Sequence, residues 1–401
     1  MNVLRGSVVL TSLVAAGLVA PALAQAPIQI SPPAQSGAAP KAAKPKRAPA
    51  AKTPAAKTPA AKAPAAPAAP AEPAPGTAAR TPAPTATTPA EAPRDDEVWP
   101  APPPGASSFA PSAAAPASAA MAAAYTAYQR GQYLTAFAQA TRLAGDAGDP
   151  KAMALLGELY ANGNGVPQDY KKAAEWYRLA AERGDAAGTF ALALLHLAGR
   201  GGPRDLAAAA KYLKTATDLG HPDATYDLAL LYIDGQQFPQ DFAKAAELFR
   251  RAADAGVPEA QYALATLYKE GRGVPQDVAA AARLLRQASG AGVLDAQVEY
   301  AIALFNGSGV EQDEAGAAAL LRKAANRGSA IAQNRLARVL AAGRGVTANA
   351  VEAAQWHMIA KAGGLSDTWL DEFVAKLSPA ERGAAEKAAK PWLAAIAQSR
   401  S

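Results

Sequence analysis

The sequence predicts an all-α fold: a solenoid of helical hairpins that repeats every 36 residues and follows a disordered segment rich in proline, alanine and lysine. Three observations predict it. Glycines and aspartates recur at this spacing, paired alanines recur with them, and 24 of the 33 prolines lie between Pro21 and Pro116. The recurring residues are Gly163, Gly199, Gly235, Gly271, Gly307 and Gly343; Gly148, Gly184, Gly220, Gly256, Gly292, Gly328 and Gly364; and Asp169, Asp205, Asp241, Asp277 and Asp313, with Asn349 in the last copy.

Residues 1–24 are predicted to be a cleavable signal peptide. Arg5 provides a positive charge, residues 6–20 are apolar, and Ala22 and Ala24 form a small-residue cleavage site. The apolar run is shorter than the roughly 20 residues that a bilayer core requires, and Pro21 ends it. We therefore expect a periplasmic protein with no transmembrane segment after cleavage. Nucleic acid is not expected as a partner, despite the net charge of +6.

Residues 25–117 are predicted to be a disordered linker, because they offer little large apolar surface to bury and their prolines exclude helix. Basic residues without any acidic ones lie in the stretch 41–62. They either keep the linker soluble or make weak contact with anionic envelope surfaces, and the lack of interleaved aromatic residues favours the first interpretation. Ten basic and five acidic residues before Ser118 account for +5 of the net charge, so the predicted solenoid is close to neutral.

Each 36-residue unit is predicted to consist of two antiparallel helices, as the fourth copy illustrates. Apolar residues at spacings of four, five and eight from Ala260 form one helical face. Gly271 ends that helix, because glycine adopts the left-handed backbone conformation without steric cost. The loop 272–276 is so short that it predicts a hairpin. Asp277 then caps the second helix, and Gly292 closes the unit.

A single hairpin cannot bury its own apolar face, so the units are expected to stack. Small paired alanines let neighbouring helices approach closely, and larger aromatic side chains fill the remaining gaps. The ends depart from the pattern. Residues 118–149 are predicted to form a degenerate hairpin, and residues 365–401 two C-terminal capping helices. A capping box from Ser378 to Glu381 opens the second of these helices.

The motif within each unit resembles the SEL-one-like repeat family, a relative of tetratricopeptide repeats. In the first copy, residues 156–181 run LGELYANGNGVPQDYKKAAEWYRLAA, against a family pattern of Leu-Gly-x-x-Tyr-x-x-Gly-x-Gly-Val-x-x-Asp followed by Lys-Ala-x-x-Trp-Tyr-x-x-Ala-Ala. Gly202 replaces Val166 in the second copy and Gln237 replaces a loop glycine in the third, departures expected to alter the loops more than the fold. The resemblance covers residues 150–364 as six repeats. It implies a right-handed α/α solenoid with adaptor or signalling roles, including envelope regulators that bind sensor proteins.

No catalytic, cofactor-binding or metal-ligating residue is predicted. The absence of cysteine excludes disulfides, thiol catalysis and cysteine-ligated metals. The repeated aspartates lie one per unit, which is typical of helix caps and not of a catalytic carboxylate pair. His196 and His357 hold positions occupied by aromatic residues in other copies, and His221 follows a helix-ending glycine. The spacing of these histidines matches no metal motif, so we expect them to be packing residues.

The residues expected to bind a partner lie on the first helices of the hairpins, which line the concave face in stacks of this kind. Two register positions on these helices vary in character from copy to copy. Drift on a solvated face would produce the same variation, and the leucines among these positions are equally well explained as interior contacts. The candidates are Asp227, Glu299, Arg335, Leu194, Leu230 and Arg338.

The leading hypothesis is a non-enzymatic periplasmic scaffold or adaptor in envelope signalling or assembly. It would dock another protein, such as an envelope sensor or an assembly factor, through the solenoid surface. The alternative is a cell-wall-associated enzyme or a binder of β-lactams or peptidoglycan, because some relatives of the family are linked to β-lactam binding. The missing nucleophile motifs count against this alternative, as do the missing cysteines, which those relatives use heavily.

Overall fold

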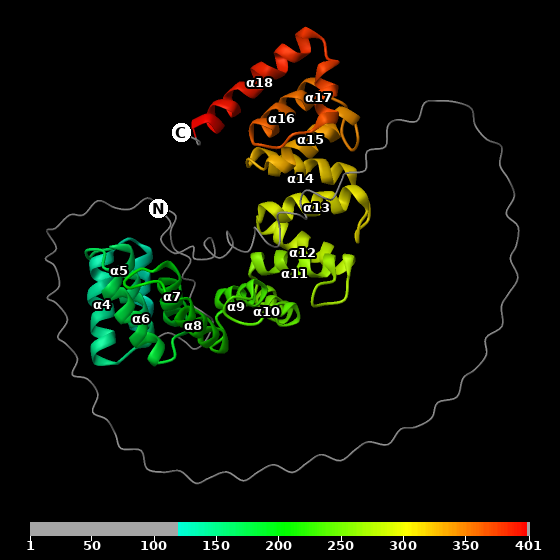
Figure 1. Cartoon of the computed structure of the whole chain (residues 1–401). Helices are drawn as coiled ribbons and strands as arrows, with labels where there is room; N and C mark the ends of the chain where they lie inside the picture. The colour runs from blue at the N-terminus through cyan, green and yellow to red at the C-terminus, as the bar shows by residue number, and fades with distance from the viewer. Residues whose placement is uncertain (1–118, 399–401) are drawn as a thin grey trace, which may run out of the picture. The chain divides into compact units, whose positions relative to one another are not determined.

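The computed structural model describes residues 119–398, in which sixteen α-helices and no strands are found, and the helices follow one another as hairpins in chain order (Figure 1). This confirms the predicted all-α stack of hairpins. The predicted signal peptide (1–24) and linker (25–117) lie outside the described residues. The helices are α3 (Ala119–Gln129), α4 (Tyr133–Asp146), α5 (Pro150–Asn162), α6 (Tyr170–Glu182), α7 (Ala186–Ala198), α8 (Leu206–Asp218), α9 (Pro222–Asp234), α10 (Phe242–Asp254), α11 (Pro258–Glu270), α12 (Val278–Gly290), α13 (Leu294–Asn306), α14 (Glu314–Asn326), α15 (Ala330–Ala342), α16 (Ala350–Ala362), α17 (Thr368–Ala375) and α18 (Pro379–Gln398).

The helix ends lie where the repeated residues predicted them. Gly271 has the left-handed conformation, with φ at 69°, and ends α11. Asp277 Oδ1 accepts a 2.8 Å hydrogen bond from the backbone N–H of Ala280 and so caps α12. The equivalent side chain caps the second helix in every repeat, which confirms the capping role of the series Asp169, Asp205, Asp241, Asp277, Asp313 and Asn349.

Small buried alanines bring the helices together. Each second helix packs on the first helix of the next hairpin as well as on its own partner. Phe249 and Tyr177 are fully buried among these alanines. The first alanine of each recurring pair is buried in all six repeats: Ala173, Ala209, Ala245, Ala281, Ala317 and Ala353. Side chains of this size permit close helix approach, while the scattered aromatic rings fill the spaces that alanine leaves.

First and second helices differ in how much of their surface they bury. On α13, the nine residues of the segments 296–299 and 301–305 are buried, whereas α6 buries only Ala173, Tyr177 and Ala180. Each helix from α4 to α16 contacts its two sequential neighbours, and the first helices α5 and α7 also contact each other. The first helices therefore expose few positions, which narrows the search for a binding surface.

Two further elements cover the C-terminal end of the stack. Ser378 and Glu381 form the predicted capping box: the backbone N–H of Ser378 donates to Glu381 Oε2 at 2.9 Å, and the backbone N–H of Glu381 donates to Ser378 Oγ at 3.3 Å. This box opens α18, which packs on α16 with the Trp392 ring 5.4 Å from that of Trp356. None of the described helices combines the length and apolar character needed to cross a membrane.

Candidate protein-interaction surface

The six residues predicted to bind a partner lie on four of the first helices. Leu194 is on α7, Asp227 and Leu230 are on α9, Glu299 is on α13, and Arg335 and Arg338 are on α15. Residues three apart lie on one side of a helix. We call the side of α7, α9, α11, α13 and α15 that carries these register positions the first-helix face.

Leu194 and Leu230 are interior residues. They are 6% and 3% exposed and belong to one hydrophobic core cluster with residues of neighbouring helices. The interpretation of these two leucines as interior contacts therefore describes them, and neither offers a surface to a partner in this conformation.

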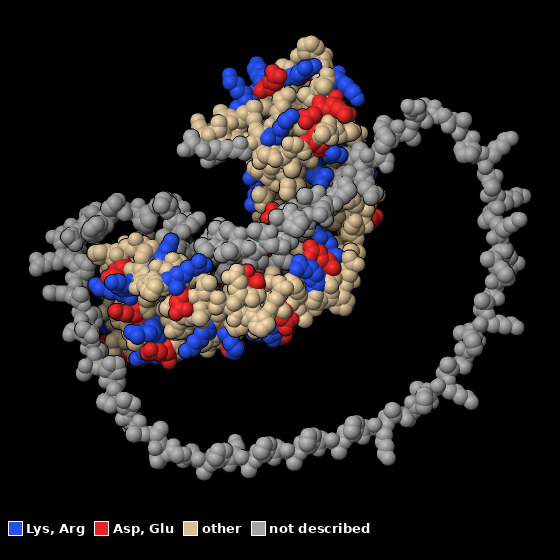
Figure 2. Space-filling view, viewed as in Figure 1, with Lys and Arg blue, Asp and Glu red and all other residues tan. Residues whose placement is uncertain are grey.

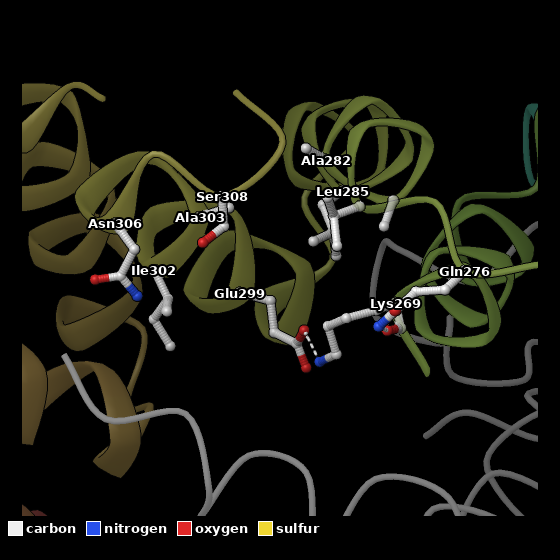
Figure 3. Close-up of a pocket in the computed structure, with 11 residues that line it drawn as sticks. Lys269, Gln276, Ala282, Leu285, Glu299, Ile302, Ala303, Asn306 and Ser308 are labelled. Atoms are coloured by element: carbon white, nitrogen blue, oxygen red, sulfur yellow. Dashed lines mark hydrogen bonds and ion pairs between the residues drawn. The ribbon is translucent and has the colours of Figure 1, made fainter. Parts of the chain in front are cut away.

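Glu299 joins two consecutive first helices. Its Oε2 lies 2.6 Å from Lys269 Nζ (Figure 3). Its Oε1 accepts a hydrogen bond of 3.4 Å from the Tyr262 hydroxyl, and both partners are on α11. The Glu299 side chain is only 8% exposed, while that of Lys269 is 33% exposed. A carboxylate this deeply buried needs such partners to offset its lost hydration, so the pair ties α11 to α13.

A pocket of about 240 Å³ lies beside this ion pair, between the fourth and fifth repeats. Glu299 and Lys269 stand at one end of it, and Asn306 and Ser308 lie toward the other (Figure 3). The pocket thus combines an apolar floor with polar groups around its opening. The floor is formed by buried residues of α12 and α13: Ala281, Ala282, Leu285, Ile302 and Ala303.

Two departures from the repeat pattern leave this pocket open. One repeat earlier, Phe242 holds the position of Val278, and the guanidinium of Arg272 lies 4.0 Å from the centre of the Phe242 ring. In the fifth repeat, Ser308 holds the position of Arg272. A serine is too short to reach across Val278, which stays 48% exposed. The smaller residues at both positions therefore create a hollow that the preceding repeat fills.

Asp227 is fully buried, and neither of its carboxylate oxygens has a hydrogen-bond partner among the described residues. Its register explains why. Asp227 lies two repeats before Glu299, and on the neighbouring helix α7 the position of Lys269 is held by Leu197. Desolvation, reinforced by the negative charge of Asp223, raises the pKa of Asp227 well above its usual range.

Arg338 is engaged within the chain. Its Nε and a terminal nitrogen donate to the two carboxylate oxygens of Asp367 at 2.6 and 2.8 Å, and Asn334 donates to the same group at 2.8 Å. Burial acts to raise the pKa of Asp367, but the hydrogen bonds from Arg338, Asn334 and the Leu370 N–H lower it below its usual value. The arginine thus fastens α15 to the N-terminus of α17.

Arg335, one turn before Arg338, lies in a partly buried position on α15. Desolvation is the main reason that the pKa of Arg335 is lowered, and the positive charge of Arg338 adds to it. These two arginines therefore place positive charge at the C-terminal end of the first-helix face.

The first helices of the third to fifth repeats are acidic. Helices α9, α11 and α13 carry seven acidic residues and a single basic one, Lys269. On the side of the molecule visible in Figure 2, basic and acidic side chains are interspersed, so this excess belongs to the three helices and not to the whole visible surface. The acids are Asp223, Asp227, Asp234, Glu259, Glu270, Asp295 and Glu299.

The histidines take part in packing and capping. His196 stacks on Tyr212 with ring centres 5.5 Å apart, and His357 is 2% exposed with Nε2 2.8 Å from Asp371 Oδ1. His221 has a role that its turn position did not predict: its Nδ1 accepts the Ala224 N–H and caps α9. Burial lowers the pKa of His221 to about 4. Across residues 119–398, no group of three or more histidine, aspartate and glutamate side chains is arranged to hold a metal ion.

The sequence did not single out Tyr262 and Lys269, because they acquire importance only through contact with the next repeat. The exposed acids Asp223, Glu259 and Asp295 were also missed, although a signal was present: they are spaced 36 residues apart, at the second position of α9, α11 and α13. Counting charges at each register position would have found them.

Comparison with protein families matches the Sel1 repeat to residues 150–185, 186–221, 222–257, 258–293, 294–329 and 330–364. Among solved structures, the chain is similar to a protective antigen of uropathogenic Escherichia coli that displays an SLR fold, with a TM-score of 0.60 and 27% identity over 70% of this chain and 61% of that one. A Sel1 repeat protein from Oxalobacter formigenes gives a TM-score of 0.53 and 28% identity over 61% of this chain and 99% of that one. The chain thus spans less than two thirds of the antigen. A comparison with curated proteins finds no match.

Proposed function

This chain belongs to the Sel1 repeat family, whose members are generally protein–protein interaction scaffolds, and from that premise we propose that it is a non-enzymatic periplasmic scaffold. It docks a protein partner in envelope signalling or assembly. The observation that carries this proposal is the open pocket between the fourth and fifth repeats, on a helix face where other register positions are filled by the chain itself.

The size of the pocket favours a protein partner over a free small molecule. Its volume of about 240 Å³ is below the range of roughly 300–1,000 Å³ that is usual for small-molecule sites. An apolar side chain projecting from a docked protein would fit this space, with its backbone near the polar groups at the opening. The alternative of a β-lactam or peptidoglycan binder lacks a comparable supporting observation.

A pair of variants tests the pocket. Ser308→Arg restores the side chain that covers the corresponding site in the preceding repeat, and Gln287→Arg adds the same charge at an exposed position of α12. We expect the full chain and the Gln287→Arg variant to retain one stoichiometric partner from an envelope extract, and the Ser308→Arg variant to lose it. Retention of the partner by all three proteins would show that the partner docks outside the pocket.

Two further measurements address the finer parts of the proposal. Protein recovered from the periplasm should begin at Gln25, as export and cleavage after Ala24 require. Purified protein should not hydrolyse a β-lactam. Hydrolysis that a single substitution abolished would contradict the non-enzymatic role and support the cell-wall enzyme.

A further inference from the structure

Three exposed acids form a row across consecutive repeats. Asp223, Glu259 and Asp295 occupy the same position near the start of α9, α11 and α13, and all three are exposed. The equivalent positions of α5, α7 and α15 carry no acid. The row is therefore confined to the third, fourth and fifth repeats, the part of the solenoid that includes the open pocket.

A second acid lies one helical turn beyond two members of this row. Asp227 follows Asp223 by four residues, and Glu299 follows Asp295 in the same way. Like charges at this spacing repel each other. On α13, Lys269 pairs with Glu299, but on α9 the Asp227 carboxyl is buried without a hydrogen-bond donor from residues 119–398.

An unpaired buried carboxyl destabilises a fold unless a donor or a cation is brought to it. Glu299 of the fifth repeat shows how this chain satisfies the same register position. The amino group of Lys269, on α11 of the fourth repeat, lies 2.6 Å from the Glu299 carboxylate. No lysine lies at the corresponding place for Asp227, because that position, on α7 of the second repeat, is Leu197. Asp227 therefore remains a buried carboxyl without a cation beside it, one helical turn from the exposed Asp223.

We propose that a lysine- or arginine-rich segment of the partner protein docks across α9, α11 and α13, with its cations beside Asp223, Glu259 and Asp295. The inference rests on the proposed scaffold function and names the chemistry of the partner. A row of acids that spans three repeats suits an extended chain better than a small amine, and its negative charge repels phosphate-bearing ligands. Asp295, Glu299, Ile302 and Asn306 follow one another along one side of α13, so an apolar side chain next to the basic residues can reach the pocket.

The test uses the full chain with fluorescent deca-lysine as the probe and deca-glutamate as the probe of opposite charge. We expect saturable binding of deca-lysine, read by fluorescence anisotropy, and none of deca-glutamate. The triple variant Asp223→Asn/Glu259→Gln/Asp295→Asn should bind deca-lysine about tenfold more weakly, because three exposed charge contacts are lost. These residues are exposed, so the variant should keep the wild-type circular dichroism spectrum.

A second triple variant controls for net charge. Glu175→Gln/Glu182→Gln/Asp254→Asn removes three exposed acids from the second helices α6 and α10, and it should bind deca-lysine within about twofold of wild type. Equal weakening by both triple variants would overturn the inference, because binding would then follow net charge alone. Absence of deca-lysine binding to the wild-type chain would overturn it as well.

The natural partner separates this inference from the function on which it rests. A captured partner that binds the Asp223→Asn/Glu259→Gln/Asp295→Asn variant as tightly as wild type overturns the basic-segment inference and leaves the scaffold role standing. If the wild-type chain captures no stoichiometric partner, the scaffold role itself is contradicted. Loss of the partner from this variant, with retention by the charge control, supports both.

Discussion

The hydroxyl of Tyr128 donates a 2.7 Å hydrogen bond to Oε1 of Glu158, which joins α3 of the N-terminal hairpin to α5 of the first repeat. Glu158 is 4% exposed, and burial raises its pKa to about 7 although the hydrogen bond from Tyr128 acts to lower it. The Glu158 charge also contributes to the raised pKa of Tyr125 and of Tyr177, for both of which burial is the larger cause. The contact between the two hairpins therefore depends on whether Glu158 is protonated.

Glu158→Gln should remove a pH dependence of stability. The folded-state pKa of about 7 lies above the ordinary value of 4.5, so folding favours the protonated form. The contribution of Glu158 to the free energy of unfolding is complete below about pH 4.5 and declines by about 3 kcal/mol as the pH rises to about 7. The glutamine keeps an acceptor for Tyr128 and cannot ionise. We expect the variant to be more stable than wild type at pH 8 and similar to it at pH 4.5.

Urea unfolding followed by circular dichroism between pH 4 and pH 8 measures this difference. Glu175→Gln, which neutralises an exposed acid on α6, serves as the control and should follow wild type at every pH. Parallel curves for wild type and Glu158→Gln would show that Glu158 does not titrate differently in the folded chain.

The sequence predicted features that are set within one repeat. Gly271 and Asp277 act on the helix that each of them ends or begins, so their types and spacing suffice to locate the helix boundaries. The link between Tyr128 and Glu158 joins residues of different hairpins, and neither residue belongs to a recurring series. Contacts of this kind depend on how one hairpin is seated on the next.

On the candidate surface, too, the sequence predicted features within one repeat and missed contacts between repeats. The sequence identified the variable register positions on the first helices but not which of them are covered. Arg338 is held by Asp367, and Glu299 is held by Lys269, so both are engaged within the chain. The pocket was also not predicted, because it results from the small size of Ser308 and Val278 relative to residues one repeat earlier.

Gly273→Ala should destabilise the fourth repeat. Gly273 has a φ of +70°, and a Cβ atom at this position would collide with the backbone carbonyl of Phe242 in the preceding repeat. Both the positive φ and the overlap oppose alanine, so we expect a loss of about 2 kcal/mol or more in the free energy of unfolding. Gly290→Ala is the matched control, because its Cβ meets no atom within 4 Å and its φ is not positive. It should raise stability by up to about 1 kcal/mol in the same urea titration.

Arg338→Ala should release the C-terminal helices. The Asp367 side chain is 5% exposed, and loss of Arg338 leaves its carboxylate with the hydrogen bonds from Asn334 and the Leu370 N–H. Removing one member of a buried pair typically costs about 3–5 kcal/mol, and the partial exposure of Arg338 places the expected loss nearer 2 kcal/mol. Limited proteolysis should then cut first around α17. Lys214→Ala breaks an exposed pair with Asp218 and should leave the cleavage pattern unchanged.

The Arg338–Asp367 pair also predicts how the stability of the C-terminal helices changes with pH. Because the pKa of Asp367 is lowered in the folded chain, its contribution is present above the ordinary value of 3.8 and is lost as the pH falls through the folded-state pKa. Wild type should therefore approach the Arg338→Ala variant in protease sensitivity at strongly acidic pH, when an acid-stable protease is used. A constant difference between the two proteins down to that pH would contradict the pairing.

Asp227→Leu should separate stability from binding. Leu155 holds the same register position in the first repeat and is 3% exposed there, so a leucine side chain suits this place in a hairpin. The substitution removes a buried carboxyl that has no hydrogen-bond donor among residues 119–398, and we expect the free energy of unfolding to rise by about 1–3 kcal/mol at neutral pH. Since the folded-state pKa of Asp227 is raised, the wild-type carboxyl is tolerated best below its ordinary value of 3.8, and the gain should grow as the pH increases above it.

Asp227→Asn completes the comparison, because it removes the charge but keeps a buried polar group. Because Asp227 is fully buried, both variants should bind deca-lysine as tightly as wild type, while only the leucine variant is more stable. Thermal unfolding and fluorescence anisotropy measure the two properties on the same samples. A leucine variant that is less stable than wild type would mean that the carboxyl already has a partner in the folded chain. Weaker deca-lysine binding by both variants would contradict a docking surface confined to the exposed row of Asp223, Glu259 and Asp295.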